Sequence, residues 1–394
     1  MLRAVLLISL LALAARADNP DAGKPEGDGW KSADLAYVPC PKDFPFTCFH
    51  GAETPVTGAT LALPTKGGNG VAVFPTDFAI GVDTVGDGKE HEKLKSDGAT
   101  AQLVLTYADG FSAPYLARFF RKIQKKTWNF ERAGYWRGSV GGEVIALIDQ
   151  SNDGMYDGYG RDAVAVGATP YATPLSKVVV LGGVLNELRV APSGRRLWVR
   201  PYKGETGKLD AVTGYKTQGK LLAAVFRSGD LAFNVVGKYK AFTLPAGSYE
   251  LVGGEVGASA GGQKAEMRKG TMSPIEVNPG ATAAAAWGMD LKITFACSLD
   301  KGVLAMKGVE VHAWGSGGEE YVNISPVKLT PEITVWSGSA PKPVLQGNLS
   351  ICPQGTIDDW KGPLQGAAGT FKVQLVEKKF AKMFGVFQSE VVQK

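Results

Sequence analysis

EVIALI at residues 143–148 and DAVAV at residues 162–166 are two short apolar runs that enclose a polar loop, DQSNDGMYDGYGR. Short runs rich in Val and Ile that end at Gly, Asp or Asn are typical of β-strands joined by turns. The same pattern recurs along the chain, in QLVLTY (102–107), KVVVL (177–181), SYELV (248–252), LKITFA (291–296) and FKVQLV (371–376). Because 51 Gly and 22 Pro separate such runs, we predict an all-β protein of two to three consecutive β-sandwich domains with little helix.

One segment departs from the strand pattern. Within residues 112–126, apolar side chains recur at helical spacing: Tyr115, Leu116, Phe119, Phe120 and Ile123. This spacing predicts the only helix of note, or an irregular segment, packed on a sheet.

The first residues have the features of a secretory signal peptide. A positively charged start at Met1–Arg3 precedes an apolar run over residues 4–15, which ends in Ala15-Arg16-Ala17. The run is too short for the roughly 20 residues that a membrane-spanning helix needs, and small residues at both ends of the triplet suit signal peptidase. We therefore expect cleavage near Ala17, a secreted or periplasmic protein and no transmembrane segment.

The net charge is small after this cleavage. The formal charge of +5 falls to +3, since Arg3 and Arg16 are removed. A basic cluster at residues 118–126 is interpreted as a solvated charged face, because short basic runs alone seldom bind nucleic acid. Together with export, this excludes nucleic acid as the expected partner.

The turn-rich segments predict five regions. These are a signal peptide (1–17), an irregular N-terminal extension (18–69), a β domain that carries the polar loop (70–168), a β-sandwich (169–288) and a second sandwich (289–394).

Four cysteines in an exported chain predict two disulfides. The local pairing joins Cys40 with Cys48 and Cys297 with Cys352, although sequence alone leaves the connectivity open. His50 near the first pair is a weaker indication of a zinc site, because an oxidising compartment favours the disulfide.

The polar loop has the composition of a calcium site. Side-chain oxygens occur at places 1, 3, 5 and 9 of the loop, the glycine of its sharp turn is at place 6, and a backbone carbonyl is available at place 7. Calcium takes six to eight oxygens in loose geometry, which such alternation provides. The expected ligands are Asp149, Ser151, Asp153, Met155 through its carbonyl, Asp157 and, in place of a glutamate at place 12, Asp162. A metal-free Asp/Gly-rich turn is the alternative.

A second stretch, residues 83–90, has the same outline, but Val85 stands at place 3 and offers no side-chain oxygen. A plain turn is the favoured interpretation there.

Four resemblances add to this picture. The aspartate loop resembles those of EF-hand-like and dockerin-like calcium sites, and TLPAGSYEL (243–251) resembles a hairpin of transthyretin-like and carboxypeptidase-regulatory-like sandwiches. Cys297, Trp314 and Cys352 resemble the immunoglobulin Cys–Trp–Cys order, which implies a Trp packed on an inter-sheet disulfide, but Ser350 stands where the tyrosine corner is expected. With the signal and WGSGGEEY (314–321), the chain resembles exported multi-domain β-sandwich proteins of Gram-negative, planctomycete-like bacteria.

Motifs of catalysis are not apparent. His91-Glu92 lacks the second histidine of a zinc protease, and the GASAG segment at residues 257–261 lacks the strand–turn–helix context of a nucleophile. The adjacent acids Glu319-Glu320 and Asp358-Asp359 point to opposite faces of a strand, so neither pair alone forms a glycosidase dyad. No catalytic residue is assigned.

The sequence therefore favours a non-enzymatic structural or binding protein of the cell envelope or extracellular space, with calcium as its expected cofactor. The partner stays open between a polysaccharide and another envelope protein. The alternative is an extracellular polysaccharide hydrolase with an unrecognised carboxylate site. Trp314, Trp336 and Trp360 are candidates for sugar stacking, but core packing is the favoured interpretation.

Overall fold

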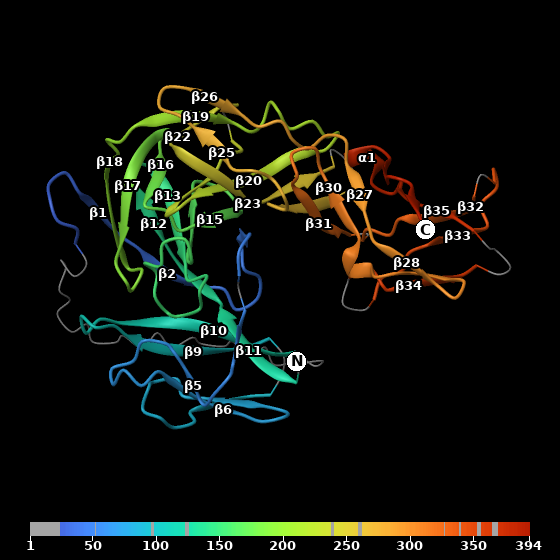
Figure 1. Cartoon of the computed structure of the whole chain (residues 1–394). Helices are drawn as coiled ribbons and strands as arrows, with labels where there is room; N and C mark the ends of the chain where they lie inside the picture. The colour runs from blue at the N-terminus through green and yellow to red at the C-terminus, as the bar shows by residue number, and fades with distance from the viewer. Residues whose placement is uncertain are drawn as a thin grey trace, which may run out of the picture. The chain divides into compact units, whose positions relative to one another are not determined.

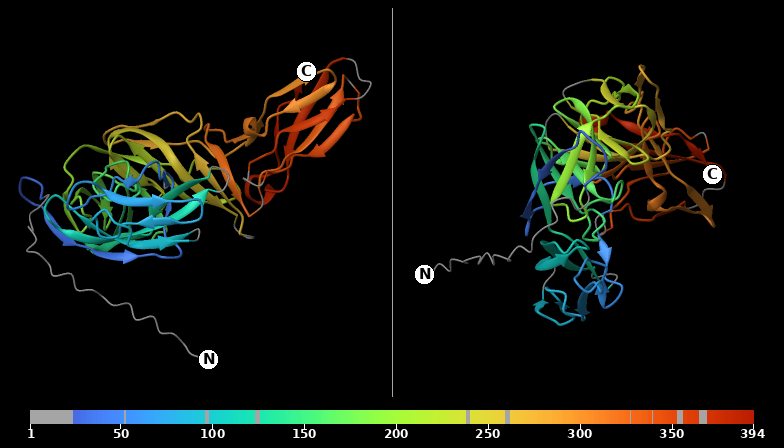
Figure 2. Two further views of the ribbon diagram at one scale, coloured as in Figure 1. Left: turned by 90° about the horizontal axis from the view of Figure 1, so that it is seen from below. Right: turned by 90° about the vertical axis from the view of Figure 1, so that its left-hand side faces the viewer.

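The computed structural model describes residues 24–51, 53–95, 98–122, 126–237, 240–258, 262–326, 328–338, 340–352, 356–364 and 369–394. Strands make up nearly all of their regular structure (Figures 1 and 2), beside a helix of one turn, α1 (Ala381–Phe384), and a 3-10 turn, Gly308–Glu310. The all-β prediction is confirmed. The predicted signal peptide and its cleavage site lie outside these residues. Among the described residues, no helix has the length and apolar character to cross a bilayer.

The chain divides into two compact units. The first comprises Met1–Pro45, Gly51–Gly158 and Leu188–Arg200. Its strands pair in four groups. These are β5 (Thr60–Leu61), β6 (Val71–Pro75), β7 (Ile80–Val82) and β8 (Glu92–Leu94); β4 (Thr54–Pro55), β11 (Thr127–Arg132), β10 (Ser112–Lys122) and β9 (Ala99–Thr106); β2 (Ala36–Pro39), β12 (Gly134–Val140) and β13 (Glu143–Ile148); and β1 (Lys31–Asp34) with β18 (Arg196–Pro201).

The predicted helix over residues 112–126 is wrong, because residues 112–122 form β10, a strand between β9 and β11. Alternate residues Ala113, Tyr115, Ala117 and Phe119 are at most 2% exposed, which is the period of a strand. Leu116, on the opposite face, is also buried. Apolar residues on both faces of one strand therefore imitate helical spacing.

The second unit comprises Phe46–His50, Tyr159–Glu187 and Pro201–Lys394. Its largest sheet runs in the order β21 (Leu231–Asn234), β20 (Lys220–Ser228), β23 (Gly247–Gly257), β24 (Lys264–Arg268), β31 (Glu320–Ser325), β30 (His312–Trp314), β27 (Lys292–Thr294), β36 (Phe387–Ser389), β35 (Phe371–Glu377), β32 (Glu332–Ser337) and β33 (Leu345–Asn348), with β25 (Ile275–Val277) and β37 (Val392–Gln393) beside it.

Smaller groups complete this unit. They are β22 (Phe242–Pro245), β19 (Thr206–Asp210) and β26 (Thr282–Ala284); β28 (Cys297–Asp300), β29 (Val303–Met306) and β34 (Trp360–Pro363); β14 (Ala163–Val166), β15 (Tyr171–Pro174) and β3 (Thr47–Cys48); and β16 (Val178–Leu181) with the first part of β17 (Val184–Val190). The residues of β17 from Leu188 onward belong to the first unit.

These units differ from the predicted domain boundaries. The expected extension at 18–69 contributes β1 and β2, which pair with β18 and β12. The expected sandwiches at 169–288 and 289–394 share one sheet, because β24 pairs with β31, and one hydrophobic core. Strand pairs between segments distant in sequence leave no compositional mark, so turn-rich segments alone do not indicate them.

The LPAG segment is a corner. Tyr249 and Leu251 are buried on one face of β23, as expected, and the Tyr249 hydroxyl donates to the carbonyl of Pro245 at 2.9 Å. However, β22 pairs with β19, while β23 pairs with β20, β24 and β25. The turn at Ala246 therefore passes the chain from one sheet to another.

The two predicted disulfides are absent from the described residues, which include all four cysteines. Cys40 and Cys48 belong to different units. Cys297 lies in the core of the second unit, whereas the sulfur of Cys352 lies 2.9 Å from Thr356 Oγ1.

The Trp of the predicted immunoglobulin-like arrangement also differs from expectation. Ala313 is the residue of β30 that enters the core, and Trp314 is half-buried on the other face. The expected packing of Trp314 on a Cys297–Cys352 disulfide is therefore not formed.

Candidate metal-binding loops

The aspartate loop begins directly after β13, in the first unit. Asp149 is fully buried, and its Oδ2 accepts hydrogen bonds from the backbone N–H of Gly154 at 2.7 Å and from the Tyr115 hydroxyl at 2.9 Å. Its Oδ1 has only longer contacts, with Asp153 N at 3.2 Å and Ser151 Oγ at 3.3 Å. One carboxylate oxygen is therefore fully engaged in fixing the loop, while the other takes weaker contacts.

Strands β9 and β10 support the loop through tyrosines that the sequence did not indicate. Tyr115 lies on the buried face of β10, and the hydroxyl of Tyr107, directly after β9, donates to the carbonyl of Gly154 at 2.9 Å. The expected helix at 112–126 concealed the role of Tyr115. The alternation of Ala113, Tyr115 and Ala117 was the signal that could have revealed it.

Two residues of the loop adopt left-handed backbone conformations. Asn152 has φ 56° and accepts a hydrogen bond from Arg132 N through its side chain at 2.8 Å, which offsets part of the strain. Gly154 has φ 75°, and a Cβ there would lie 2.7 Å from Pro64 and 2.8 Å from Leu105. Place 6 therefore requires glycine for both its conformation and its packing.

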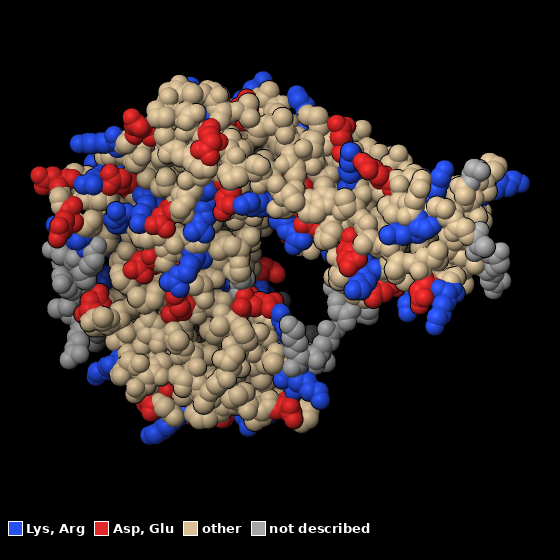
Figure 3. Space-filling view, in the orientation of Figure 1, with Lys and Arg blue, Asp and Glu red and all other residues tan. Residues whose placement is uncertain are grey.

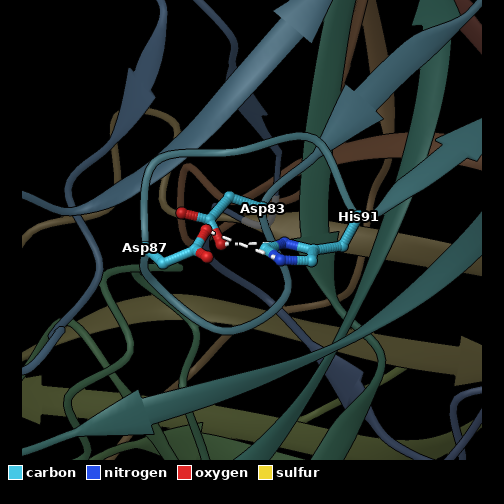
Figure 4. Close-up of side chains that lie close together, drawn as sticks. All are labelled: Asp83, Asp87 and His91. Atoms are coloured by element: carbon cyan, nitrogen blue, oxygen red, sulfur yellow. Dashed lines mark ion pairs between the residues drawn. The ribbon is translucent and has the colours of Figure 1, made fainter.

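A second loop, between β7 and β8, has the same construction (Figure 4). Asp83 is 1% exposed, and its Oδ2 accepts from Gly88 N at 2.7 Å, as Asp149 accepts from Gly154. The second aspartates, Asp87 and Asp153, each accept from the N–H two residues on, at 3.0 Å.

The two loops also match in backbone conformation. Gly86 and Gly88 have positive φ at places 4 and 6, as Asn152 and Gly154 do. The similarity that the sequence suggested is thus a shared hydrogen-bond pattern, although place 3 of the second loop remains Val85.

The loops differ at place 9, where the second has His91 and the first has Asp157. The two ring nitrogens of His91 lie 3.4 Å from Asp83 Oδ1 and 3.5 Å from Asp87 Oδ1 (Figure 4). Asp83, Asp87 and His91 place potential metal ligands within 4.8 Å of one another. The His91 imidazole therefore lies within 3.5 Å of both carboxylates.

The electrostatics of the two buried aspartates are opposite. Burial favours a neutral Asp83, but the N–H groups of Gly88, Gly86 and Val85 outweigh it and lower its pKa. Burial and the neighbouring charge of Asp153 raise the pKa of Asp149 to about 6. A charged Asp149 is therefore costly at neutral pH unless a cation approaches it.

The predicted ligands lie as follows. Carboxylate oxygens of Asp149 and Asp153 come within 4.8 Å of each other, and Ser151 Oγ is 3.3 Å from Asp149 Oδ1. Met155 and Asp157 follow in the same loop and are half-buried. Asp162 belongs to the second unit, where it is 1% exposed and its carbonyl accepts from Leu175 N. Its role as a ligand stays a prediction.

The acids considered for catalysis each have structural hydrogen bonds. Glu319 is fully buried and accepts from Gly288 N at 2.7 Å, whereas Glu320, on the opposite face, contacts His312 and Arg268. Asp358 accepts from the Ser350 hydroxyl, and Asp359 accepts from Gly308 N.

The basic residues of the cluster that belong to β10 have ion-pair partners. Arg118 contacts Glu131, Arg121 contacts Asp77 and Lys122 contacts Glu53. Basic and acidic side chains are also interspersed over the face seen in Figure 3. This arrangement agrees with a solvated charged face.

Neither a protein-family model nor a curated protein sequence matches the chain.

Proposed function

We propose that this protein is an exported, non-enzymatic structural or binding protein of the cell envelope or extracellular space, and that calcium in the loop 149–157 stabilises its first unit. The observation that carries the calcium proposal is the fully buried Asp149 carboxylate, whose nearest charged neighbour in its loop is another carboxylate, Asp153. A divalent cation would remove the repulsion and compensate for the burial.

The donor set of the loop fits calcium. With calcium–oxygen distances of about 2.3–2.6 Å, two oxygens on one ion lie up to about 5 Å apart. The separations of Asp149 from Ser151 and from Asp153 fall within this limit. All of these donors are oxygens, which suits calcium better than zinc.

The loop also contains a polar atom that is suited to a hydrated ion. The Tyr156 hydroxyl is buried and has no hydrogen-bond partner among the described residues. Calcium in protein loops often keeps water ligands, and such a water would provide the missing partner.

The exported location supports occupancy. Outside the cytoplasm, sites with dissociation constants of about 10⁻⁴–10⁻³ M are typical of calcium-stabilised modules. The apolar run at residues 4–15 and the Ala15-Arg16-Ala17 triplet are the basis for this location. Cleavage is tested by N-terminal sequencing of the secreted protein, where a start other than near Asp18 would contradict it.

Calcium binding is tested by thermal melts in EGTA and in 10 mM calcium. A dissociation constant in the stated range predicts stabilisation by about 1.4–2.7 kcal/mol at that concentration. Terbium luminescence, sensitised by the tyrosines beside the loop and reversed by excess calcium, measures binding independently of stability. No melting shift together with no terbium signal would overturn the proposal.

The equivalent loop supplies a matched control. Asp153→Ala removes a place-5 carboxylate from the proposed site and should abolish both the shift and the luminescence. Asp87→Ala makes the same change at place 5 of the loop that contains His91, and should leave both unaltered. Equal losses in the two variants would assign the effect to general destabilisation.

A further inference from the structure

The outward face of the large sheet in the second unit carries a row of polar and aromatic side chains. Strand register places Arg268, Glu320, Trp314, Lys292 and Gln388 side by side across β24, β31, β30, β27 and β36. Figure 1 shows β31, β30 and β27 next to one another. The residues that alternate with this row enter the core; they are Met267, Tyr321, Ala313, Ile293 and Phe387. The row therefore points away from the core.

Trp314 lies at the centre of this row in a fixed position. Its indole Nε1–H donates to Thr294 Oγ1 of β27 at 2.7 Å. On its other side, a Cβ added to Gly270 would lie 2.5 Å from the indole Cζ3. The indole thus extends from β27 on one side of β30 towards Gly270, which follows β24, and it remains half-buried. Contacts at opposite edges hold the ring along the sheet surface.

A preorganised set of hydrogen-bonding groups surrounds the indole. The Glu320 side chain is only 5% exposed, and its two oxygens contact His312 Nδ1 at 2.7 Å and Arg268 Nε at 2.5 Å. This leaves the Nε2 edge of a 33% exposed His312 and a 58% exposed Arg268 at the surface. Lys292, opposite Trp314, is 64% exposed.

We propose that this face, centred on Trp314 and defined by His312, Arg268 and Lys292, binds a neutral polysaccharide. A saccharide presents apolar C–H groups on its ring faces and hydroxyls at its edges. An immobilised indole offers the apolar contact, and the charged groups of Arg268 and Lys292 offer strong hydrogen bonds to hydroxyls. Each basic group of this face has an acidic partner, since Arg268 and His312 contact Glu320 and Lys292 lies 3.7 Å from Glu390. The face therefore favours an uncharged ligand over a polyanion.

This inference rests on the proposed binding function, but it uses residues of the second unit only. If no calcium response is observed, the saccharide proposal is therefore unaffected. The reverse also holds, because saccharide binding does not require the loop at 149–157.

The test is native electrophoresis of the full mature chain in gels that contain xylan, mixed-linkage β-glucan or galactomannan, with alginate as an anionic comparison. We expect at least one neutral polysaccharide to slow migration. Trp314→Ala should weaken this retardation at least tenfold, whereas Trp314→Phe should retain most of it because it keeps an aromatic ring.

A control and a second variant keep the result decisive. Phe78→Ala removes an aromatic side chain that is 86% exposed in the first unit and should leave retardation unaltered. If Trp314→Ala fails to fold by circular dichroism, Lys292→Ala replaces it and should weaken retardation at least threefold. The proposal is overturned if no neutral polysaccharide slows the protein, if only alginate does, or if the folded Trp314 and Lys292 variants behave like the parent.

Discussion

Glu319 and Glu320 are adjacent in sequence, yet their environments shift their pKa values in opposite directions. Burial raises the pKa of Glu319 above its ordinary value of 4.5, despite hydrogen bonds from Gly288 and Tyr321. Glu320 is also buried, but Arg268 and His312 outweigh this and lower its pKa. The strand alternation that sends the two side chains to opposite faces is the cause.

These shifts predict that the contributions of Glu319 and Glu320 to the stability of the fold change in opposite directions with pH. The folded protein holds the Glu319 proton more tightly than the unfolded chain does, so the contribution of Glu319 to stability declines as the pH rises above 4.5. The contribution of Glu320 is present above 4.5 and is lost as the pH falls through its lowered pKa. Glu320→Gln should lower the free energy of unfolding by about 1.5–3 kcal/mol at neutral pH, and urea unfolding should show that this loss becomes smaller in acid. The loss of unfolding free energy in Glu319→Gln should instead become smaller as the pH rises from 4 to 7. Parallel profiles for the two variants would refute this assignment.

A second prediction at this scale concerns the two place-6 glycines. Gly88 and Gly154 have φ 84° and 75°, but a Cβ on Gly88 meets nothing within 4 Å, whereas one on Gly154 meets Pro64, Leu105 and Leu63. Gly88→Ala should therefore cost about 1 kcal/mol, the conformational penalty alone. Gly154→Ala should lower the free energy of unfolding by about 1–3 kcal/mol more than Gly88→Ala does, because overpacking adds to the conformational penalty. Chemical denaturation measures both, and equal costs would show that packing does not constrain Gly154.

At the scale of the element, β10 connects the scaffold to the candidate site. It pairs with β9 and β11, and its buried face presents Tyr115 to Asp149. The hydroxyl of Tyr115 engages Oδ2, so that Oδ1 is the atom with only long contacts. A strand thus determines which carboxylate oxygen is available to a cation.

Tyr115→Phe should accordingly weaken both stability and cation binding. Loss of a buried hydrogen bond to a charged acceptor costs about 1.5–3 kcal/mol. Terbium affinity should also fall several-fold, since Asp149 loses one of its two short hydrogen bonds. Tyr249→Phe is the matched control, because it removes a buried hydroxyl bonded at 2.9 Å to Pro245 in the second unit. It should lower stability without changing terbium affinity, and a loss of affinity there would contradict the role given to Tyr115.

Local patterns in the sequence predicted the strands around residues 143–148 and 162–166 and the conformation of the aspartate loop. They did so because alternation, Asp-mediated turns and left-handed glycines act over a few residues. The environment of the loop was not predictable in this way. Tyr107 and Tyr115 reach it through strand pairing, and the strand that carries Tyr115 has apolar residues on both faces, which imitated a helix.

At the scale of the whole molecule, the chain passes repeatedly between its two units. Residues 46–50 and 159–187 belong to the second unit, while residues 51–158 and 188–200 belong to the first. Sequence-based boundaries assume contiguous domains, which this arrangement does not have. It also means that no single cut divides the chain into its two units. Both proposed sites must therefore be tested in the full mature chain.

Hydrogen exchange in that chain separates the two proposals spatially. Because calcium would bind the loop that follows β13 and contacts β10, it should increase amide protection at residues 112–122 and 143–158. Residues 264–268 and 320–325, in β24 and β31 under the saccharide face, should exchange at the same rate with and without calcium. Asp153→Ala should remove the gain. A gain that extends to residues 159–166 and is lost in Asp162→Asn would establish Asp162 as a ligand, since that residue lies outside the loop. If calcium slows exchange equally across both units, or nowhere, stabilisation by a discrete site at 149–157 is excluded.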